Sequence, residues 1–197
     1  MARDMVPVLK RCRSLGLDPI YLGIDKKSYR KSIRGNKKKS EYGLQLTEKQ
    51  KAKFIYGVLE KPFRNYFKKA SKMKGITGDN LMVLLEMRLD NVMFRLGYGR
   101  TRKESRQIVG HKHVSVNGQM VSIPSYKVKV GDVIEIREKY KDSQRYKDIL
   151  EVTGGRLIPE WLDADYENLT GIIKEIPTRE QIDVPVNETL IVELYSK

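Results

Sequence analysis

The segment from Arg88 to Arg137 constrains the fold most, because it joins two helical patterns to a run of alternating apolar residues. A first helix is predicted across the start of this segment, because apolar residues occur there at steps of four, three and four: Leu85, Leu89, Val92 and Leu96. Gly97 and Gly99 predict the end of this helix, since glycine readily adopts the left-handed conformation that follows many helices. The first helix should therefore bury one apolar side.

A second helix is predicted directly afterwards. Thr101 is a suitable N-cap, and Glu104 three residues later completes a capping box. Helical geometry places Ser105, Ile108 and Val109 on the inner face. The neighbouring face is expected to present three basic side chains: Arg102, Lys103 and Arg106. This face is a candidate surface for a polyanion.

The rest of the segment predicts a small antiparallel sheet. Val114 and Val116 alternate, and the pair Asn117-Gly118 favours the type I′ turn of a tight hairpin. Further half-buried strand positions are expected at Val121, Ile123, Val128, Ile134 and Ile136. Two small helices packed on this sheet would place a basic helix edge beside the first hairpin, which suits an RNA-binding surface.

The segment resembles the small RNA-binding domain first named for the fourth protein of the small ribosomal subunit. The resemblance rests on these residues: Arg88-Leu89-Asp90, Arg100-Thr101-Arg102, Arg106-Gln107, His111, Val116-Asn117-Gly118, Pro124-Ser125 and Gly131-Asp132. It implies paired helices against a strongly bent antiparallel sheet, with folded RNA bound at the helix face. Tyrosyl-tRNA synthetases, pseudouridine synthases and a heat-shock protein also carry this domain, so the flanking sequence must distinguish between them.

Charge is distributed unevenly along the chain. The net charge is +14, but residues 1–150 carry 35 Lys+Arg against 15 Asp+Glu, whereas residues 151–197 carry 4 against 10. Concentrated positive charge is typical of a protein that binds a polyanion such as RNA. An anionic membrane is the other candidate polyanion, but no apolar run approaches the roughly eighteen residues of a membrane span. The N-terminus also lacks a signal pattern, so a cytoplasmic protein is expected.

Residues 1–46 are predicted to form a basic arm that becomes ordered against RNA, because like charge opposes compaction. Its candidate RNA-binding residues are Arg3, Lys10, Arg11, Arg13, Lys37, Lys38 and Lys39. From Thr47, which with Gln50 could form a capping box, the pattern becomes helical. The helices of residues 47–87 should present further cations to phosphates: Lys49, Lys53, Arg64 and Lys68.

Beyond Arg137 the sequence predicts a short polar helix that ends at Gly154-Gly155, followed by strands separated by acidic turns. The last residues fit either a strand or a short helix. Asn187 is a good N-cap, which favours the helix.

Segments outside the RNA-binding domain resemble the bacterial family of small-subunit ribosomal protein four: SEYGLQLTEKQKAKFIYGVLEKPFRNYF, GDNLMVLLEMRLDNV and NETLIVELYSK. The resemblance implies an α+β fold, in which a helical domain of residues 47–87, completed by 178–197, contains an inserted RNA-binding domain of residues 88–177. Some members of the family bind zinc through four N-terminal cysteines. Only Cys12 occurs here, so no metal and no other cofactor is expected.

An enzymatic function is not supported. Arg88-Leu89-Asp90 also resembles the catalytic aspartate motif of pseudouridine synthases, but such enzymes need a further catalytic domain for which this chain has no room. Asp90 is expected instead to pair with a basic residue or to cap backbone. His111 and His113 lack ligand partners at metal-binding spacing and are expected to contact RNA.

The functional prediction is a structural protein of the small ribosomal subunit that binds 16S rRNA. The expected contacts to phosphates and sugars come from Arg100, Arg102, Arg106, His111, Lys112 and His113. By the family resemblance, the protein binds a junction in the 5′ domain early in assembly and contributes to translational accuracy. The same resemblance places Lys37 to Lys39 near the mRNA entry, beside small-subunit proteins three and five. The alternative is a repressor that binds its own operon's mRNA with the same surface.

Overall fold

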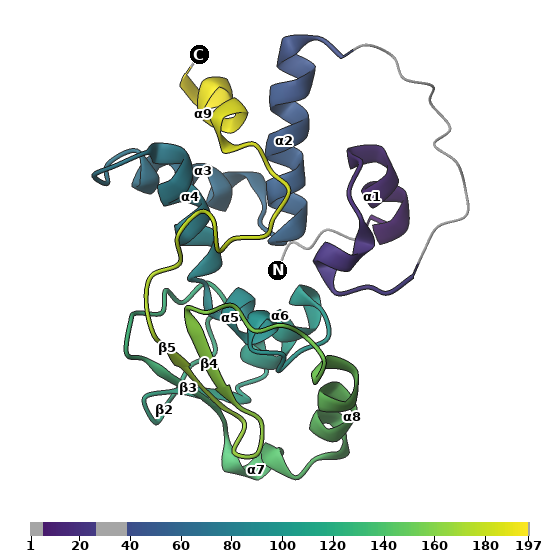
Figure 1. Cartoon of the computed structure of the whole chain (residues 1–197), viewed down its shortest axis with the longest axis vertical. Coiled ribbons are helices and arrows are strands. Elements are labelled where there is room, and N and C mark those ends of the chain that lie inside the picture. The colour runs from purple at the N-terminus through teal and green to yellow at the C-terminus, as the bar shows by residue number, and fades with distance from the viewer. Residues whose placement is uncertain (1–5, 27–38, 197) are drawn as a thin grey trace. The chain divides into compact units, whose positions relative to one another are not determined.

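The protein is represented by a computed structural model, which describes residues 6–26 and 39–196 (Figure 1). The described residues fall into two compact units. One holds the residues up to Met82 together with those from Asp183 onward, and the other is Val83–Ile182. The second unit is thus inserted in the sequence of the first. The domain boundaries expected from the sequence, at residues 88 and 177, stay predictions.

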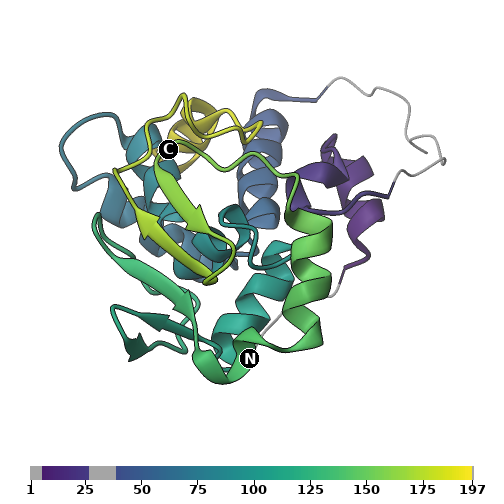
Figure 2. The same cartoon turned by 60° about the horizontal axis from the view of Figure 1, so that its bottom comes forward.

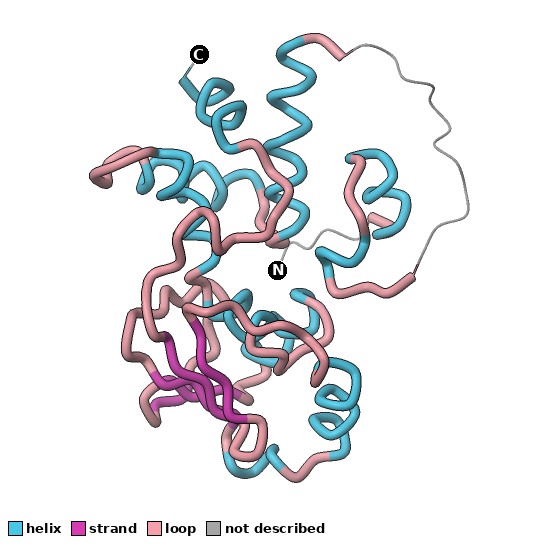
Figure 3. Tube along the Cα trace, viewed as in Figure 1, coloured by secondary structure: helices cyan, strands magenta, loops and turns pink. Residues whose placement is uncertain are grey.

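Helices make up the regular structure of the first unit, as the secondary-structure colouring shows (Figure 3). They are α1 (Val8–Leu15), the 3₁₀ helix η1 (Pro19–Leu22), α2 (Glu41–Ile55), α3 (Glu60–Ala70), α4 (Thr77–Glu86), which continues into the second unit, and α9 (Glu188–Ser196).

Helix α9 packs beside α2, although the two are far apart in the sequence (Figure 1). The Gln45 amide donates a hydrogen bond to the Glu193 carboxylate at 3.0 Å, and the Asn187 backbone N–H donates to the Glu48 carboxylate at 3.0 Å. Asn187 also caps α9, because its Oδ1 accepts from the Thr189 N–H. The helical alternative for the C-terminal residues is therefore confirmed.

The expected start of α2 at Thr47 is wrong. The helix begins six residues earlier at Glu41, and Ser40 is the N-cap, because its Oγ accepts a hydrogen bond from the Gly43 N–H. Thr47 lies within the helix, and its hydroxyl donates to the carbonyl of Gly43 at 2.7 Å. Both residues are of a type that favours caps, and the apolar positions of the helix begin before Thr47, so the earlier cap prevails.

The segment expected to be a basic arm has regular structure in its described part. Helix α1 buries Cys12 and Leu15, and Gly16 ends it in the left-handed conformation, with φ of 67°. Burial raises the pKa of the Cys12 thiol, and the charge of Asp18 adds to this effect. The weak apolar periodicity of residues 8–15 gave no signal for this helix because few residues of so short a helix are buried.

The second unit contains a five-stranded antiparallel sheet with the strand order β2-β1-β3-β5-β4 (Figure 2). The strands are β1 (Val114–Val116), β2 (Gln119–Met120), β3 (Val133–Ile136), β4 (Leu162–Asp165) and β5 (Thr170–Ile173). The helices of the unit are α5 (Leu89–Arg95), α6 (Arg102–Gly110), α7 (Glu138–Lys141) and α8 (Gln144–Thr153). The predicted α+β class is confirmed.

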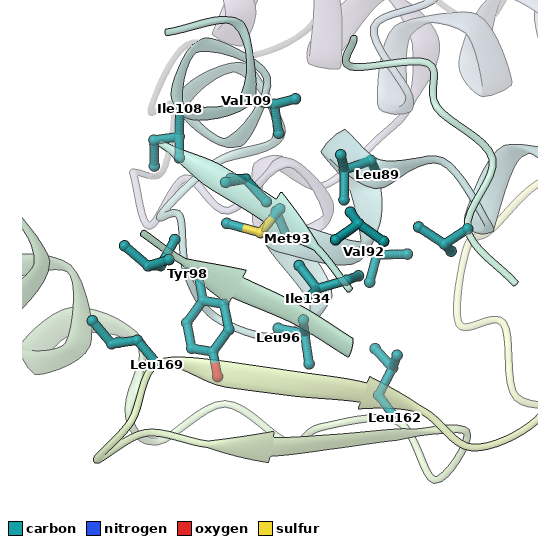
Figure 4. Packing of buried hydrophobic residues seen from close by; sticks show 14 of the residues in the cluster. Leu89, Val92, Met93, Leu96, Tyr98, Ile108, Val109, Ile134, Leu162 and Leu169 are labelled. Carbon is teal, nitrogen blue, oxygen red and sulfur yellow. The ribbon is translucent and has the colours of Figure 1, made fainter. Parts of the chain in front are cut away.

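Side chains from α5, α6 and the strands share one core (Figure 4). Helix α5 contributes Leu89, Val92 and Met93, each 0% exposed, and β3 contributes Ile134. The packing is close at Gly171 of β5, where an added Cβ would lie 2.5 Å from a methyl group of Leu96. Area burial of this kind is the main source of stability for a small unit.

The tight hairpin between β1 and β2 is confirmed. Asn117 and Gly118 have φ of 51° and 76°, which are the positive values that a type I′ turn requires. The Asn117 side chain also donates to Asp132 at 2.9 Å and accepts from the Val133 N–H. This residue therefore ties the hairpin to the start of β3.

Three of the expected strand positions are wrong. Val121, Ile123 and Val128 lie outside the strands. Ile123 is 59% exposed, whereas Val128 is buried. The residues that follow Ile123 pair with α5 and not with a neighbouring strand. The carbonyls of Pro124 and Tyr126 accept hydrogen bonds from the first N–H groups of α5. The loop thus satisfies the unpaired donors at a helix N-terminus instead of extending the sheet.

The single first helix expected from Leu85 to Leu96 is interrupted. Helix α4 ends at Glu86, and Arg88 is extended, with φ of −82° and ψ of 137°, and forms a β-bridge with Lys127. Asn91 spans the break, because its Nδ2 donates to the backbone carbonyl of Glu86 at 3.0 Å and to its carboxylate at 2.6 Å. Apolar spacing alone continues through this break, so the sequence pattern concealed it.

Candidate nucleic-acid interface

The N-terminus of α6 is held by the predicted cap. Thr101 Oγ1 accepts a hydrogen bond from the Glu104 N–H at 3.1 Å. In a standard capping box the Glu104 carboxylate would accept a hydrogen bond from the Thr101 N–H. Here it accepts one from the N–H of the preceding residue, Arg100, at 2.9 Å. This variant of the capping box also brings the Arg100 side chain to Glu104.

Arg100 is 47% exposed, and its guanidinium pairs with Glu104 through Nε at 3.2 Å and Nη2 at 3.3 Å. Burial by itself would raise the pKa of Glu104, but the hydrogen bonds and charge of Arg100, with the charge of Arg145, outweigh it and lower the pKa. The carboxylate therefore stays ionised and orients an exposed cation at the start of α6.

Arg102 does not project from α6, so that expectation is wrong. The residue is 7% exposed, its Nε donates to Asn91 Oδ1 at 2.7 Å, and its guanidinium lies 4.3 Å from the ring centroid of Phe94. These contacts fasten α6 to α5. Helical spacing indicated the correct side of the helix but not the presence of α5 against it.

Arg106 lies one turn further along α6 and is 38% exposed. Its Nη1 donates to Asp90 Oδ2 at 2.9 Å, while Arg88 pairs with the same carboxylate through Nε at 3.0 Å and Nη2 at 2.6 Å. The expectation that Asp90 pairs with a nearby basic residue is confirmed. Both oxygens of the Asp90 carboxylate are paired with arginines, which suits a structural role.

The C-terminus of α6 forms a Schellman motif. The N–H of Lys112 donates to the carbonyl of Val109 at 3.0 Å, and the N–H of His113 donates to that of Ile108 at 3.3 Å. Lys112 occupies the left-handed position, with φ of 64°, where glycine is usual. The motif leaves Lys112 and His111 exposed at the end of the helix.

His113 points toward α7 and α8 instead of into solvent. Its ring stacks on Tyr140, and its Nδ1 lies 3.1 Å from the hydroxyl of Tyr146. Burial lowers the pKa of His113, and nearby positive charges lower it further: Arg145, His111, Lys139 and Arg137. A neutral His113 thus supports the end of α6, while its half-buried ring offers little surface for a direct RNA contact.

Arg156, which the sequence patterns did not single out, holds the loop before α6. Its guanidinium donates to the carbonyls of Gly99 at 3.4 Å and Arg100 at 2.6 Å, and lies 4.9 Å from the Phe94 ring centroid. Desolvation by burial lowers the pKa of Arg156. The residue is 56 positions from Arg100 in the chain, so no local pattern could have indicated this role.

The basic side chains at this end of the second unit lie on α6 and at its two ends. We call Arg100, Lys103, Arg106, His111 and Lys112 the α6 basic edge. Each of the five is exposed or half-buried. Arginine offers five N–H donors in a planar fork that matches phosphate oxygens, and lysine offers a compact charge. The arrangement can therefore bind the backbone of folded RNA.

The first unit places two of its predicted cations around one acid. Lys49 and Lys53 pair with Glu60 at 3.0 and 2.7 Å, and the Tyr195 hydroxyl donates to the same carboxylate at 2.9 Å. Burial alone would raise the pKa of Glu60, but the hydrogen bonds from Lys53, Lys49 and Tyr195 outweigh it and lower the pKa to about 2. Arg64 and Lys68 are exposed on α3.

The remaining predicted cations lie in or near the N-terminal segment. Lys10 and Lys39 are exposed, and Lys39 donates to Thr47 Oγ1 at 3.2 Å. Arg11 and Arg13 are half-buried, and Arg11 donates to the Gln50 side chain at 3.1 Å. Three further predicted residues lie outside the described part of the chain: Arg3, Lys37 and Lys38.

The described residues contain neither a metal-binding cluster nor a membrane-spanning helix. No group of three or more His, Cys, Asp or Glu side chains within residues 6–26 and 39–196 is arranged to hold a metal ion. Over the same ranges, no helix combines the length and apolar character needed to cross a membrane.

Comparison with known proteins identifies the family. The family described as "Ribosomal protein S4/S9 N-terminal domain" matches residues 3–86, and the "S4 domain" matches residues 87–134. Relatives named "Small ribosomal subunit protein uS4" include those of Lachnoclostridium phytofermentans, Lachnospira eligens and Agathobacter rectalis. They are 75%, 73% and 72% identical to this chain, and each match covers 100% of both proteins. These names denote a ribosomal protein and not an enzyme, and the chain belongs to the uS4 family of small ribosomal subunit proteins.

Proposed function

We propose that this protein is a structural component of the small ribosomal subunit that binds 16S rRNA directly. The observation that carries the proposal is the α6 basic edge. Arg100 and Arg106 are each held by a carboxylate yet remain 47% and 38% exposed, so both guanidinium groups are oriented before any RNA is present. Pre-oriented donors lose less conformational entropy when they bind. The surplus of 20 positive charges in residues 1–150 supplies the long-range attraction.

The finer assignments follow from the family resemblance. The protein is proposed to bind a junction in the 5′ domain of the rRNA and to nucleate assembly. The segment of Lys37 to Lys39 is proposed to lie at the mRNA entry region, beside small-subunit proteins three and five. The protein as a whole is proposed to contribute to translational accuracy. The site of action would then be the cytoplasm. The basic residues of α2 and α3 would contact adjoining RNA helices.

The test is a salt titration of binding to the isolated 5′ domain of 16S rRNA, with tRNA and the operon's leader mRNA as competitors. Binding that exceeds both competitors and weakens steeply with salt is expected, because each neutralised phosphate releases counterions. Equal affinity for all three RNAs would contradict a specific role in the subunit. A preference for the leader mRNA would assign the protein to translational repression instead.

A further inference from the structure

We propose that Asp90 is a positioning residue for RNA binding, which acts by holding the guanidinium of Arg106 at the surface in the orientation that receives a phosphate. The inference rests on the proposed function and deepens it. It concerns a carboxylate that cannot itself attract RNA, because its charge has the wrong sign. The effect of Asp90 must therefore pass through a neighbouring cation.

The geometry of the cluster separates a buried part from an exposed part. The side chains of Asp90 and Arg88 are 6% and 4% exposed, whereas that of Arg106 is 38% exposed. Arg106 Nη1 donates to Asp90 Oδ2 at 2.9 Å. An arginine has five N–H donors, and the structure gives Arg106 a single partner within the described residues, so the donors on its exposed side are available to a ligand.

Arg88 explains why Asp90 does not simply neutralise Arg106. Arg88 approaches both carboxylate oxygens, through Nε to Oδ1 at 3.0 Å and through Nη2 to Oδ2 at 2.6 Å. The cluster contains two guanidinium groups and one carboxylate, so it carries a net charge of +1. Phosphate is still attracted, and the aspartate contributes orientation while Arg88 balances its charge.

The backbone fixes the carboxylate in turn. Asp90 lies in the first turn of α5, and its N–H donates to the carbonyl of Pro124 at 3.1 Å, beside the Leu89 N–H, which donates to that of Tyr126 at 2.9 Å. Helix α5 is buried on several sides, so Asp90 cannot follow a moving side chain. Asp90 therefore holds the Arg106 guanidinium in a fixed position. A side chain that binds RNA directly needs a rigid support of this kind.

The experiment compares Asp90→Asn, Arg106→Ala and the double variant in the salt titration with the isolated 5′ domain. Asp90→Asn makes the protein more positive by one charge, so charge counting alone predicts tighter binding. Positioning predicts weaker binding, by about threefold to tenfold for one charge-assisted contact. The slope of log affinity against log salt should fall by about one. In the Arg106→Ala background, Asp90→Asn should have no further effect.

Asp163→Asn is the matched control. Asp163 lies on β4, is 58% exposed and pairs with Lys174 at 3.4 Å, so its replacement adds the same charge away from Arg106. It should bind RNA as tightly as the wild type or slightly more tightly. The proposal is overturned if Asp90→Asn behaves like this control, or if its loss of affinity persists in full without Arg106.

A folding defect must be separated from a binding defect, because Asp90→Asn removes a buried negative charge that pairs with Arg88. Thermal unfolding identifies this case. If the variant is unfolded at the assay temperature, Arg106→Lys replaces it, because lysine keeps the charge but lacks the planar fork. Weaker RNA binding by Arg106→Lys would then support positioning, and affinity equal to the wild type would refute it.

A readout without RNA separates this inference from the proposed function. In the free protein, the Nη1 group of Arg106, which donates to Asp90, should give an NMR signal with restricted rotation and slow exchange, and Asp90→Asn should abolish both properties. If the signal behaves as expected but the wild type shows no preference for the 5′ domain, then the rRNA assignment fails. A mobile Arg106 in the wild-type protein would refute positioning itself.

Discussion

His113 and Tyr140 lie face to face, with ring centroids 3.8 Å apart and an angle of 5° between the ring planes. Tyr146 approaches the Nδ1 atom of the same imidazole from α8. The pKa of His113 is lowered chiefly because the ring is removed from water, and secondly because the surrounding groups are cationic. The end of α6 is therefore supported by a histidine that must remain neutral.

Stability should fall when the solution is acidified below the ordinary histidine pKa of about 6.5. The folded-state pKa is lower than the unfolded one, so the unfolded chain binds more protons in this window and acid favours unfolding. Urea unfolding at pH 7.5 and pH 5.5 measures the change. His113→Gln should show a smaller difference between the two pH values than the wild type, and an unchanged difference would contradict the role of His113.

Glu60 should produce a separate pH dependence in more acid solution. Its pKa is lowered from 4.5 to about 2, so its contribution to stability is complete above pH 4.5 and is lost as the pH falls through 2. Glu60→Gln should flatten the stability profile in that range relative to the wild type. Glu180→Gln, which removes an exposed carboxylate, is the control. Equal slopes for the two variants would contradict the cluster with Lys49 and Lys53.

The corrected start of α2 can be tested with two hydroxyl residues. Ser40→Ala should lower the free energy of unfolding by about 1 kcal/mol, because the Gly43 N–H loses its capping acceptor. Thr47→Ala removes only a hydroxyl that donates within the helix, and alanine has the higher helix propensity, so little or no loss is expected. Denaturant titration distinguishes them. A larger loss for Thr47→Ala would restore the cap expected from the sequence.

Arg100 and Arg102 should respond to replacement by alanine in opposite ways. Arg100→Ala should reduce the salt slope of RNA binding by about one and change stability by less than about 0.5 kcal/mol. Arg102→Ala should lower stability by about 1–3 kcal/mol, because it leaves the buried Asn91 Oδ1 without its donor. Thermal unfolding and RNA titration of both proteins provide the measurements. Similar stabilities for the two variants would refute the buried role of Arg102.

Lys112 is expected to lower the stability of the protein and to raise its affinity for RNA. Glycine adopts φ of 64° without strain, so Lys112→Gly should raise the free energy of unfolding by up to about 1 kcal/mol and weaken RNA binding. Lys112→Ala keeps the backbone strain and removes the charge, so it should weaken binding to the same extent without the gain in stability. A lysine that could be replaced by glycine without loss of affinity would have no role in the α6 basic edge.

Signals that act over a few residues predicted the local structure well. The Thr101 cap, the Asn117-Gly118 turn, the Gly97 helix end and the Asn187 cap each depend on neighbours in the sequence, and the structure contains all four. Each of these residues satisfies nearby backbone groups or adopts a conformation that others resist. Their effect is therefore largely independent of the rest of the fold.

Features that depend on distant partners could not be read in the same way. The break between α4 and α5 after Glu86 depends on the loop that contains Pro124 and Tyr126. The burial of Arg102 depends on Asn91 and on the Phe94 ring, both on α5. A basic residue at helical spacing indicates which side of a helix it occupies. Whether that side faces water or another helix is decided by tertiary packing.

The return of the chain to its first unit has a consequence for synthesis. Helix α2 makes its hydrogen bonds with α9 only after the 100 residues of Val83–Ile182 have been made. At about 5–20 residues per second, this takes on the order of 5–20 s. During that interval the inserted unit can complete its own core, while the partner face of α2 remains uncovered. We therefore expect the inserted unit to fold first. The first unit is completed last, when α9 packs against α2.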